Sequence, residues 1–347
     1  MGELPPWQPS LAEAWRAYAL RWKRRRLLFR AFRKRRQVVA LADRTAEIRK
    51  GQILAFVTIR NEALRLPFFL DHYRRLGVGH FLVVDNDSTD GSRDLLAAQA
   101  DVSLWRSSHG YKQSRFGLDW LTWLQRRHGS GHWCLTLDAD EILVYPYCET
   151  RPLQALVERL EDQGLQALGT LMLDLYPKGP LAAQSHAPGQ DPVETLPWFD
   201  SGNYVTQVQP RMRNLWIQGG PRARKFFAEE PRRAPTLNKI PLVRWQRGYV
   251  YVNSTHAILP RRLNAVYDET GGERISGVLL HTKFLPEIVR KSAEERERQE
   301  HFANSALYES YYQSLTQSPD LWCDSSRRYA GWRQLEALGL LSRGGWV

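Results

Sequence analysis

Several features are absent from this sequence, and each absence excludes a class of protein. Only three cysteines occur, Cys134, Cys148 and Cys323. They lie far apart with no C-x-x-C pair, which argues against a disulfide framework or a zinc site and fits a reducing cytosol. No run of eighteen or more apolar residues exists, so no transmembrane helix is predicted. The N-terminus lacks the apolar core of a signal peptide, and we therefore expect a cytoplasmic protein.

Glycine-rich phosphate loops are also missing. Neither G-x-x-x-x-G-K-[S/T] nor G-x-G-x-x-G appears, which excludes P-loop and dinucleotide-binding proteins. The segment VTIRNEA, after the first predicted strand, contains no glycine, and this counts against a nucleotidyltransferase. Hydrophobic residues make up 43% and charged residues 25% of the chain, which is typical of a soluble globular protein.

Positive charge is concentrated near the N-terminus. The net charge is +12, and between Arg16 and Arg36 lie eleven Lys or Arg residues and no acid. Trp15, Trp22 and Phe29 are among the aromatic residues of this segment. The pattern is typical of a basic amphipathic helix on an anionic membrane surface. The alternatives are a solvated helix packed on the main domain and, less favoured because the rest of the chain is nearly balanced in charge, a nucleic-acid contact.

From Ile53 onward, apolar segments alternate with helical patterns. Strands are predicted for ILAFVTI, HFLVVD, VSLW, WCLTL and ALGTLMLD, and helices for 66–76, from 92, 113–127 and 152–163. This alternation predicts an α/β fold with a mainly parallel sheet. Residues 177–203 are rich in Pro, Gly and Ser and predict a long mobile loop over a site. We divide the chain into a helical leader (1–50), an enzymatic domain (51–285) and a helical extension (286–347).

Polar side chains follow three of the predicted strands. They form the groups Arg60-Asn61-Glu62, Asp85-Asn86-Asp87 and Asp138-Ala139-Asp140-Glu141. Ligands bind at the carboxyl ends of the strands in such sheets. In an extended chain, Asp138 and Asp140 lie on the same side. Two carboxylates there can hold Mg²⁺ or Mn²⁺ together with phosphate oxygens, and an acidic turn or helix cap is the alternative.

The order of these segments resembles glycosyltransferase family 2. VVDNDSTDGS is similar to the family's VVDDGSTDGT, and the opening strand with Arg-Asn-Glu and the spacing to Asp138-Ala139-Asp140 are also similar. GGPRAR, KIPLVRW, STH and GVLLHTKFL resemble a bacterial branch of family-2-like transferases. The resemblance covers residues 52–315. It implies the GT-A fold, a Rossmann-like domain that binds a nucleotide sugar through Mn²⁺ or Mg²⁺ and inverts the anomeric centre.

The resemblance also implies which residues bind the nucleotide sugar. Asp85 matches the family acid that contacts the base, with Asn86 where the family often has a second Asp and Asp87 where it usually has Gly. Further members of the expected nucleotide-sugar site are Arg60, Asn61, Glu62, Lys112, Gln113, Arg115, Asp138, Arg222 and Lys283. Lys112, Gln113 and Arg115 belong to a loop that approaches the nucleotide in the family.

The expected metal ligands are Asp138, Asp140 and His281. Asp138 and Asp140 match the family's Asp-x-Asp, and Asp140 is the better candidate for direct contact, while Asp138 is also a candidate for the ribose. Enzymes of this fold often supply one late histidine, and His281 is suited to that role. Lys283 lies on the same strand side and would neutralise the diphosphate. A core histidine is the alternative for His281, and His256 is an alternative ligand or acceptor contact.

A carboxylate near the acceptor is expected to act as the catalytic base. Asp174, at a predicted strand end, and Asp200, in the loop-like segment, are the candidates, with Glu229 behind them. Arg222 or Arg224 would add positive charge where the diphosphate leaves. A capping or surface role is the alternative for each acid.

The predicted function is sugar transfer from a nucleotide sugar to a glycan or lipid-linked acceptor in the synthesis of a polysaccharide, lipopolysaccharide or glycolipid. The expected location is the cytoplasm or the inner face of a bacterial membrane, reached through residues 12–40, with no nucleic-acid partner. A nucleotidyltransferase and a non-catalytic binding protein on the same frame stay open. The joint presence of Asp85, Asp138, Asp140 and His281 argues against the latter.

Overall fold

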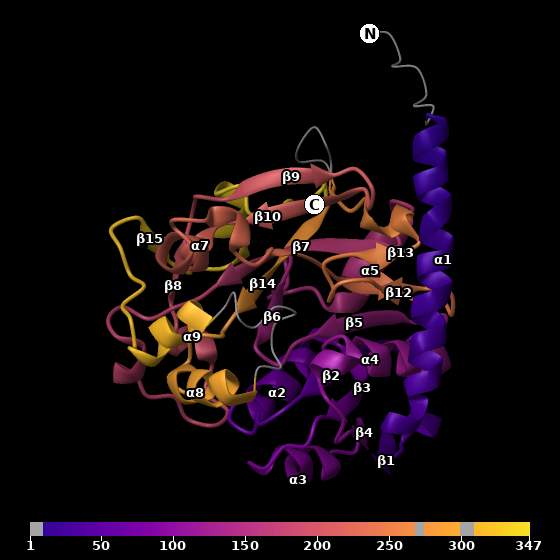
Figure 1. Cartoon of the computed structure of the whole chain (residues 1–347), viewed down its shortest axis with the longest axis horizontal. Helices are drawn as coiled ribbons and strands as arrows, with labels where there is room; N and C mark the ends of the chain where they lie inside the picture. The colour runs from indigo at the N-terminus through magenta and orange to yellow at the C-terminus, as the bar shows by residue number, and fades with distance from the viewer. Residues whose placement is uncertain (1–9, 268–273, 299–308) are drawn as a thin grey trace.

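The structure, a computed structural model, describes residues 10–267, 274–298 and 309–347, and Figure 1 shows its arrangement. A nine-stranded sheet lies at the centre of these residues, in the order β1-β4-β3-β2-β5-β11-β7-β14-β6. The strands are β1 (Val39–Ala42), β2 (Ile53–Ile59), β3 (Val78–Asp85), β4 (Val102–Arg106), β5 (Trp133–Leu137), β6 (Glu141–Val144), β7 (Ala167–Asp174), β11 (Asn238–Arg244) and β14 (Ser276–His281).

The sheet is mainly parallel. Strands β4, β3, β2 and β5 are parallel neighbours, and β7 and β14 pair in parallel with each other. Strand β11 is antiparallel to both β5 and β7, so β7 and β14 run in the same direction as the first four. Only the edge strands β1 and β6 and the inserted β11 run the other way. The α/β fold with a mainly parallel, Rossmann-like sheet that the sequence predicts is thereby confirmed.

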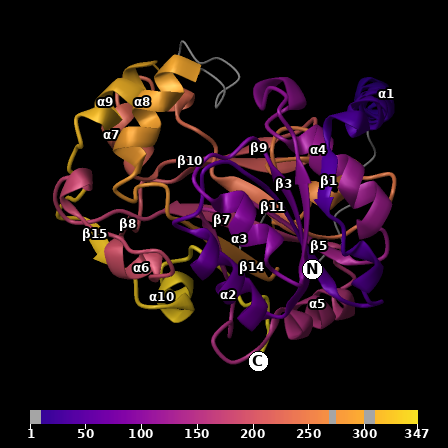
Figure 2. The same ribbon diagram turned by 90° about the horizontal axis from the view of Figure 1, so that it is seen from below.

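Helices cover both faces of the sheet, which explains why its central strands are continuously apolar. On β2, Ala55 and Val57 point to one face, where α2 (Leu66–Leu76), α3 (Ser92–Ala97) and α5 (Leu153–Asp162) pack. Leu54 and Phe56 point to the other, where α4 (Leu118–Leu124) packs. Helix α1 (Leu11–Arg33) lies outside α4. Figure 2 shows α2 and α5 on one side of the sheet and α4 and α1 on the other.

Smaller elements surround the second half of the sheet. Three two-stranded pairs form there: β9 (Val205–Gln209) with β10 (Asn214–Gln218), β12 (Val250–Tyr251) with β13 (Ile258–Leu259), and β8 (Trp198–Asp200) with β15 (Ser326–Arg328). The helices are α6 (Pro192–Thr195), α7 (Gly220–Phe226), α8 (Ile288–Arg298), α9 (Glu309–Thr316) and α10 (Trp332–Ala337). Helices α7, α8 and α9 gather at one end of the molecule (Figures 1 and 2). None of the described helices combines the length and apolar character needed to cross a bilayer.

Some predicted elements differ from the structure. The N-terminal helix ends at Arg33, and residues 39–42 form the edge strand β1, whose apolar VALA pairs with β4. The helix predicted over 113–127 is interrupted, because Arg115 and Phe116 have positive φ angles before α4 begins. Residues 177–203 are only partly a free loop: residues 182–190 are mostly exposed, whereas residues 192–200 form α6 and β8, with Phe199 fully buried. Residues 299–308, part of the predicted C-terminal helix, lie outside the described residues.

Candidate active site

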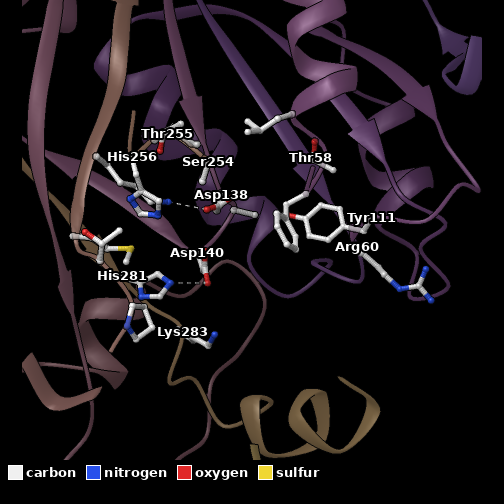
Figure 3. Close-up of a pocket in the computed structure, with 18 of the residues that line it drawn as sticks. Thr58, Arg60, Tyr111, Asp138, Asp140, Ser254, Thr255, His256, His281 and Lys283 are labelled. Atoms are coloured by element: carbon white, nitrogen blue, oxygen red, sulfur yellow. Dashed lines mark hydrogen bonds and ion pairs between the residues drawn. The ribbon is translucent and has the colours of Figure 1, made fainter. Parts of the chain in front are cut away.

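A cavity of about 630 Å³ opens at the carboxyl edge of the sheet (Figure 3). Its walls come from the loops that follow β2, β3 and β5, from the end of β14, and from α7 and α8. The polar side chains that line it include Arg60, Asn61, Glu62, Arg65, Asn86, Asp138, Asp140, Arg222, Lys239, His256, His281, Lys283 and Lys291. The three strand ends that the sequence singles out therefore deliver residues to one cavity.

A chain of three side chains, Asp140–His281–Asp174, lies at one wall of the cavity. Nε2 of His281 is 3.2 Å from Oδ2 of Asp140, and Nδ1 is 2.6 Å from Oδ1 of Asp174. His281 and Asp174 are register partners on the parallel strands β14 and β7. Asp140 is held beside them because its carbonyl oxygen accepts hydrogen bonds from the backbone N–H and the hydroxyl of Thr282. Figure 3 shows Asp140 turned toward His281.

The electrostatics around Asp140, His281 and Asp174 favour the charged form of each of the three side chains. Burial alone would raise the pKa of Asp140, but His281, Arg65 and Lys283 outweigh it and hold that pKa well below its usual value. Burial is likewise outweighed at Asp174, where Arg222 and His281 lower the pKa to about 2. The pKa of His281 is raised against the effect of burial by its two carboxylate neighbours. Two carboxylates thus stay ionised around one imidazole.

Asp140 and His281 offer a donor set that fits a divalent cation. Because a carboxylate only accepts hydrogen bonds, both nitrogens of the charged His281 ring donate, Nδ1 to Asp174 and Nε2 to Asp140. A cation that binds between Nε2 and Asp140 would displace the Nε2 proton, and Asp174 would keep the proton on Nδ1. A carboxylate oxygen and a neutral imidazole suit Mn²⁺. Within the described residues, no group of three or more His, Cys, Asp or Glu is arranged to hold a metal ion. A cation at Asp140 and His281 would therefore take its remaining ligands from substrate and water.

The sequence predicts that Asp138 shares a metal site with Asp140 and His281, but its side chain pairs with Lys239 instead. Its Oδ2 accepts a hydrogen bond of 2.9 Å from Lys239, which also bonds Glu141. The side chain of Asp138 is half exposed and faces the cavity, whereas Asp140 pairs with His281. Burial raises the pKa of Glu141 to about 7, and the Lys239 cation opposes that rise. The structure thus joins Asp138 to Lys239 and does not bring it to His281.

Two buried cations that the sequence predicts, Arg222 and Lys283, line the cavity. Nε of Arg222 donates to Oδ2 of Asp174 at 2.7 Å, while its Nη2 has no hydrogen-bond partner among the described residues. Helix α7 approaches β7 closely enough for this contact because Gly219 and Gly220 have positive φ angles. A buried guanidinium N–H without a partner is costly, and an anionic ligand in the cavity would satisfy it.

The loop after β2 brings Arg60, Asn61 and Glu62 to the cavity as predicted. Nη1 of Arg60 donates to the carbonyl oxygen of Asn86, which also lines the cavity. The Asn61 N–H donates to Ser88 Oγ, and this ties the β2 loop to the turn after β3. Arg65, which the sequence did not single out, is buried and paired with Glu62 at 2.8 Å. No sequence signal marks Arg65, because an arginine at the start of a helix is common.

Four residues expected at the nucleotide do not line the cavity: Asp85, Lys112, Gln113 and Arg115. Asp85 is buried beneath the turn, where it accepts hydrogen bonds from Arg93 and from the Ser88 N–H. Arg115 turns toward Asp119 and the carbonyl oxygen of Tyr251. Their neighbours Tyr111 and Phe116 line the cavity instead. The aromatic side chains, and not the cations of this loop, therefore face the ligand space.

Neither carboxylate predicted as the catalytic base faces the cavity. Both oxygens of Asp174 are engaged, one by His281 and one by Arg222. Asp200 is buried among Tyr176, Arg224 and Asn203. Their placement does not support a role as base: Asp174 instead orients His281, and Asp200 holds Arg224.

His256 is the cavity residue whose chemistry suits a base. It lies beside Ser254 and Thr255 in the cavity wall (Figure 3). Its Nδ1 is 2.6 Å from the carbonyl oxygen of Asn238, an obligate acceptor, so Nδ1 carries the proton. Burial, with Lys239 nearby, lowers the pKa of His256 to about 4. The ring is neutral near pH 7 and its Nε2 is the nitrogen that can accept a proton, but a pKa of about 4 makes it a weak base that the Asp138 carboxylate only partly strengthens.

Comparisons with known proteins give limited similarity. No protein-family model and no curated protein sequence matches this chain. Among solved structures, a mannosyltransferase from Pyrobaculum calidifontis in complex with GDP-Man and Mn²⁺ matches 49% of this chain with 21% identity and a TM-score of 0.26. A 4-diphosphocytidyl-2C-methyl-D-erythritol synthase matches 38% with 16% identity and a TM-score of 0.25. The chain spans 45% and 65% of the lengths of these two proteins.

Proposed function

We propose that this chain is a metal-dependent glycosyltransferase that moves a sugar from a nucleotide-sugar donor to a glycan or lipid-linked acceptor. The observation that carries the proposal is the Asp140–His281–Asp174 chain, set in a cavity at the carboxyl edge of a mainly parallel sheet. The resemblance of the sequence motifs to glycosyltransferase family 2 supports it. The same resemblance implies transfer with inversion.

The donor diphosphate would lie between the acid–imidazole pair and the buried cations. When bound at Asp140 and His281, a divalent cation supplies Lewis-acid stabilisation of the leaving diphosphate. Arg222 and Lys283 line the same cavity and would hold negative charge on the diphosphate oxygens through fixed positive charge. Asp174 keeps the His281 ring in one orientation and one tautomer. Arg60, Asn61 and Asn86 line the same cavity and would contact the nucleoside.

The acceptor would approach along the wall that carries His256. Nε2 of His256 takes the proton of the acceptor hydroxyl, whose oxygen forms the new bond to the anomeric carbon. The bond from that carbon to the diphosphate oxygen breaks, and the nucleoside diphosphate leaves with the electron pair. The step balances without any further reactant. Asp138, held by Lys239, is half exposed in the same wall and is available to bind an acceptor or ribose hydroxyl.

The deciding experiment is a thermal-shift panel on the full chain with UDP-, GDP-, CMP- and dTDP-sugars and with CTP and UTP, each with and without Mn²⁺. A ligand at one hundred times its Kd adds about 2.7 kcal/mol to the free energy of unfolding, which is roughly 4 °C for a chain of this size. We expect such a shift with one nucleotide sugar, and only with Mn²⁺ present. A shift with CTP or UTP but with no nucleotide sugar would identify a nucleotidyltransferase instead.

Single substitutions test whether Asp140 and His281 bind the metal ion. Asp140→Asn and His281→Gln are expected to lose the Mn²⁺-dependent part of the shift and to reduce metal-dependent turnover at least a hundredfold, because each removes a metal donor. Asp71→Asn, the same chemical change at an exposed acid, is the control and is expected to behave as the wild type. An Mn²⁺-dependent shift that survives in Asp140→Asn would contradict the metal-site assignment.

A further inference from the structure

Helix α1 uses only one of its faces to pack on the rest of the protein. Leu20, Leu27 and Ala31 are buried, and Leu20 and Leu27 form a small apolar cluster with Val250 and Leu259. At 100° per residue these three helix positions lie within a narrow arc. Figure 1 shows α1 along one side of the molecule. The direction of the opposite face is thereby fixed, because the buried face is anchored to the body.

The opposite face of α1 carries a row of exposed aromatic side chains. The exposed fractions are 72% for Trp15, 48% for Tyr18, 60% for Trp22 and 61% for Phe29, and Leu11 begins the row at 86%. Their spacings of four, three, four and seven residues place them on one stripe of the helix, about half a turn from the buried face. A row of large aromatic side chains held in water by a folded body marks an interaction surface.

Arginines flank this aromatic stripe. The Arg21 guanidinium lies 5.4 Å from the ring centre of Tyr18, and that of Arg25 lies 5.3 Å from the ring centre of Trp22. Arg26 and Arg33 are exposed on the other flank. The surface therefore has a central apolar stripe with positive charge on both sides. Amphipathic helices that lie in the headgroup region of anionic bilayers have this arrangement, with aromatic side chains inserted and cations at the phosphates.

We propose that α1 docks the protein on an anionic lipid bilayer, with Leu11, Trp15, Tyr18, Trp22 and Phe29 facing the lipid. Positive charge alone would also suit a nucleic acid, but a duplex contact needs cations toward the phosphates, and here aromatic side chains occupy the centre of the face. The headgroup region of a bilayer suits both the aromatic stripe and the flanking arginines, because it buries aromatic rings and pairs arginine with phosphate. The inference does not rest on the proposed chemistry of the cavity.

The docked helix is tied directly to the cavity wall. Arg30 and Lys34 both donate to the carbonyl oxygen of Gln113, and Nε of Arg30 bonds the buried carboxylate of Asp119 at 2.6 Å. Gln113 lies in the loop whose Tyr111 and Phe116 line the cavity. A bilayer that holds α1 would therefore fix the orientation of the loop of Tyr111 and Phe116 relative to the membrane.

Vesicle co-sedimentation of the full chain tests the proposal. Vesicles of phosphatidylcholine alone are compared with vesicles that contain 30% phosphatidylglycerol, a composition set on the order of the anionic content of natural membranes. We expect binding to the anionic vesicles at least tenfold tighter than to the neutral ones, and a loss of binding when salt rises from about 0.1 M to 0.5 M, where screening shortens the reach of each charge. Equal binding to both vesicle types would overturn the proposal.

Matched variants separate the helix face from general basicity. Trp15→Ala/Trp22→Ala/Phe29→Ala is expected to reduce binding at least tenfold, whereas Val205→Ala/Val208→Ala, which removes exposed apolar side chains of β9, is expected to leave it unchanged. Arg21→Gln/Arg25→Gln is expected to weaken binding about tenfold or more, since each cation near the surface contributes. Arg327→Gln/Arg328→Gln, an equal charge change at exposed β15 residues, is its control.

A nucleic-acid control completes the test. Fluorescence anisotropy with a short DNA duplex is measured on the wild type and on the aromatic variant under the same salt conditions. If the aromatic variant keeps full vesicle binding, the aromatic stripe is not the lipid-facing surface and the proposal fails. The proposal also fails if the wild type binds the duplex more tightly than anionic vesicles, because the surface then serves a polyanion other than lipid. Unchanged melting temperatures are expected for all these variants, because every altered side chain is exposed.

Discussion

At the scale of the residue, the role of His256 depends on one hydrogen bond to the Asn238 carbonyl. His256→Gln keeps a polar side chain of similar reach but has no group that takes a proton at neutral pH. We expect turnover to fall 10²- to 10⁴-fold, the usual contribution of a general base, with little change in donor binding. The measurement is sugar transfer or donor hydrolysis together with the donor-induced thermal shift. A parallel loss of both would indicate a structural role.

The lowered pKa of His72 predicts that the stability of the protein depends on pH. Burial, with Arg75 nearby, lowers the pKa of His72 to about 4, below the unfolded value of about 6.5. The unfolded chain therefore binds a proton that the folded chain refuses, so the free energy of unfolding falls as the pH falls from 6.5 toward 4. The loss at pH 5 amounts to about 2 kcal/mol. Urea unfolding of the wild type and His72→Phe at pH 7 and pH 5 measures it.

In that comparison the variant keeps the ring stack with Phe68, whose centre lies 5.7 Å away, and removes the titrating group. We expect the wild type to lose about 2 kcal/mol more than the variant between the two pH values. Equal losses would show that the His72 ring is already protonated in the folded state or is solvated there.

The sequence identifies a site residue when a motif marks it, and it misses contacts between residues that lie far apart along the chain. Asp140 and His281 were predicted as neighbours on family resemblance, and the structure places them 3.2 Å apart. Lys239 opens the family-like KIPLVRW but was not predicted as a site residue, although it neutralises Asp138, because the two are 101 positions apart and the motif gives its lysine no role. Asp174 was predicted to face the acceptor, but a strand end alone does not say that an arginine from α7 will occupy its carboxylate.

At the scale of the element, α7 depends on the backbone of Gly219. The φ angle there is +151°, and a Cβ atom would overlap the carbonyl oxygen of Asn203. We expect Gly219→Ala to lower the free energy of unfolding by about 2 kcal/mol or more, because the clash is with backbone and α7 must shift. The shift would also draw Arg222 away from Asp174. Urea unfolding measures the first effect and nucleotide-sugar binding the second.

Gly248→Ala is the control for that substitution. An added Cβ at Gly248 meets open space, so a change within about 0.5 kcal/mol is expected there. Equal effects at the two glycines would contradict the account of α7.

The elements that sequence patterns predicted well are the continuous apolar runs. ILAFVTI and WCLTL are short apolar runs, and both form buried central strands. The segment over 113–127 has helical periodicity, but Gly117 lies against Thr58 and the chain takes positive φ angles before it, so the helix begins only at Leu118. The composition of the segment 177–203 predicts a loop, yet Leu181 and Phe199 are buried and anchor it to the body on either side of a mostly exposed stretch, 182–190. Tertiary packing overrides local composition in both cases.

At the scale of the whole molecule, the α/β class was predictable and the order of the strands was not. The alternation of strands and helices up to residue 174 predicts the parallel half of the sheet. The other half is completed by β11 and β14, whose residues follow a long irregular stretch, and by the edge strand β6, which begins one residue after Asp140. Local patterns do not tell which strand such a segment joins, and only the register of β14 against β7 brings His281 to Asp174.

The position of β11 also bears on how the protein is made. Strand β11 fills the gap between β5 and β7, although it is synthesised after both. A growing chain whose β5 has emerged has an unpaired central edge until residue 244 follows, about 100 residues later, which is roughly 5 to 20 s of translation. Open strand edges recruit other chains. The nascent protein therefore passes through an interval in which the edges of β5 and β7 that β11 later joins are unpaired, beside the future candidate site.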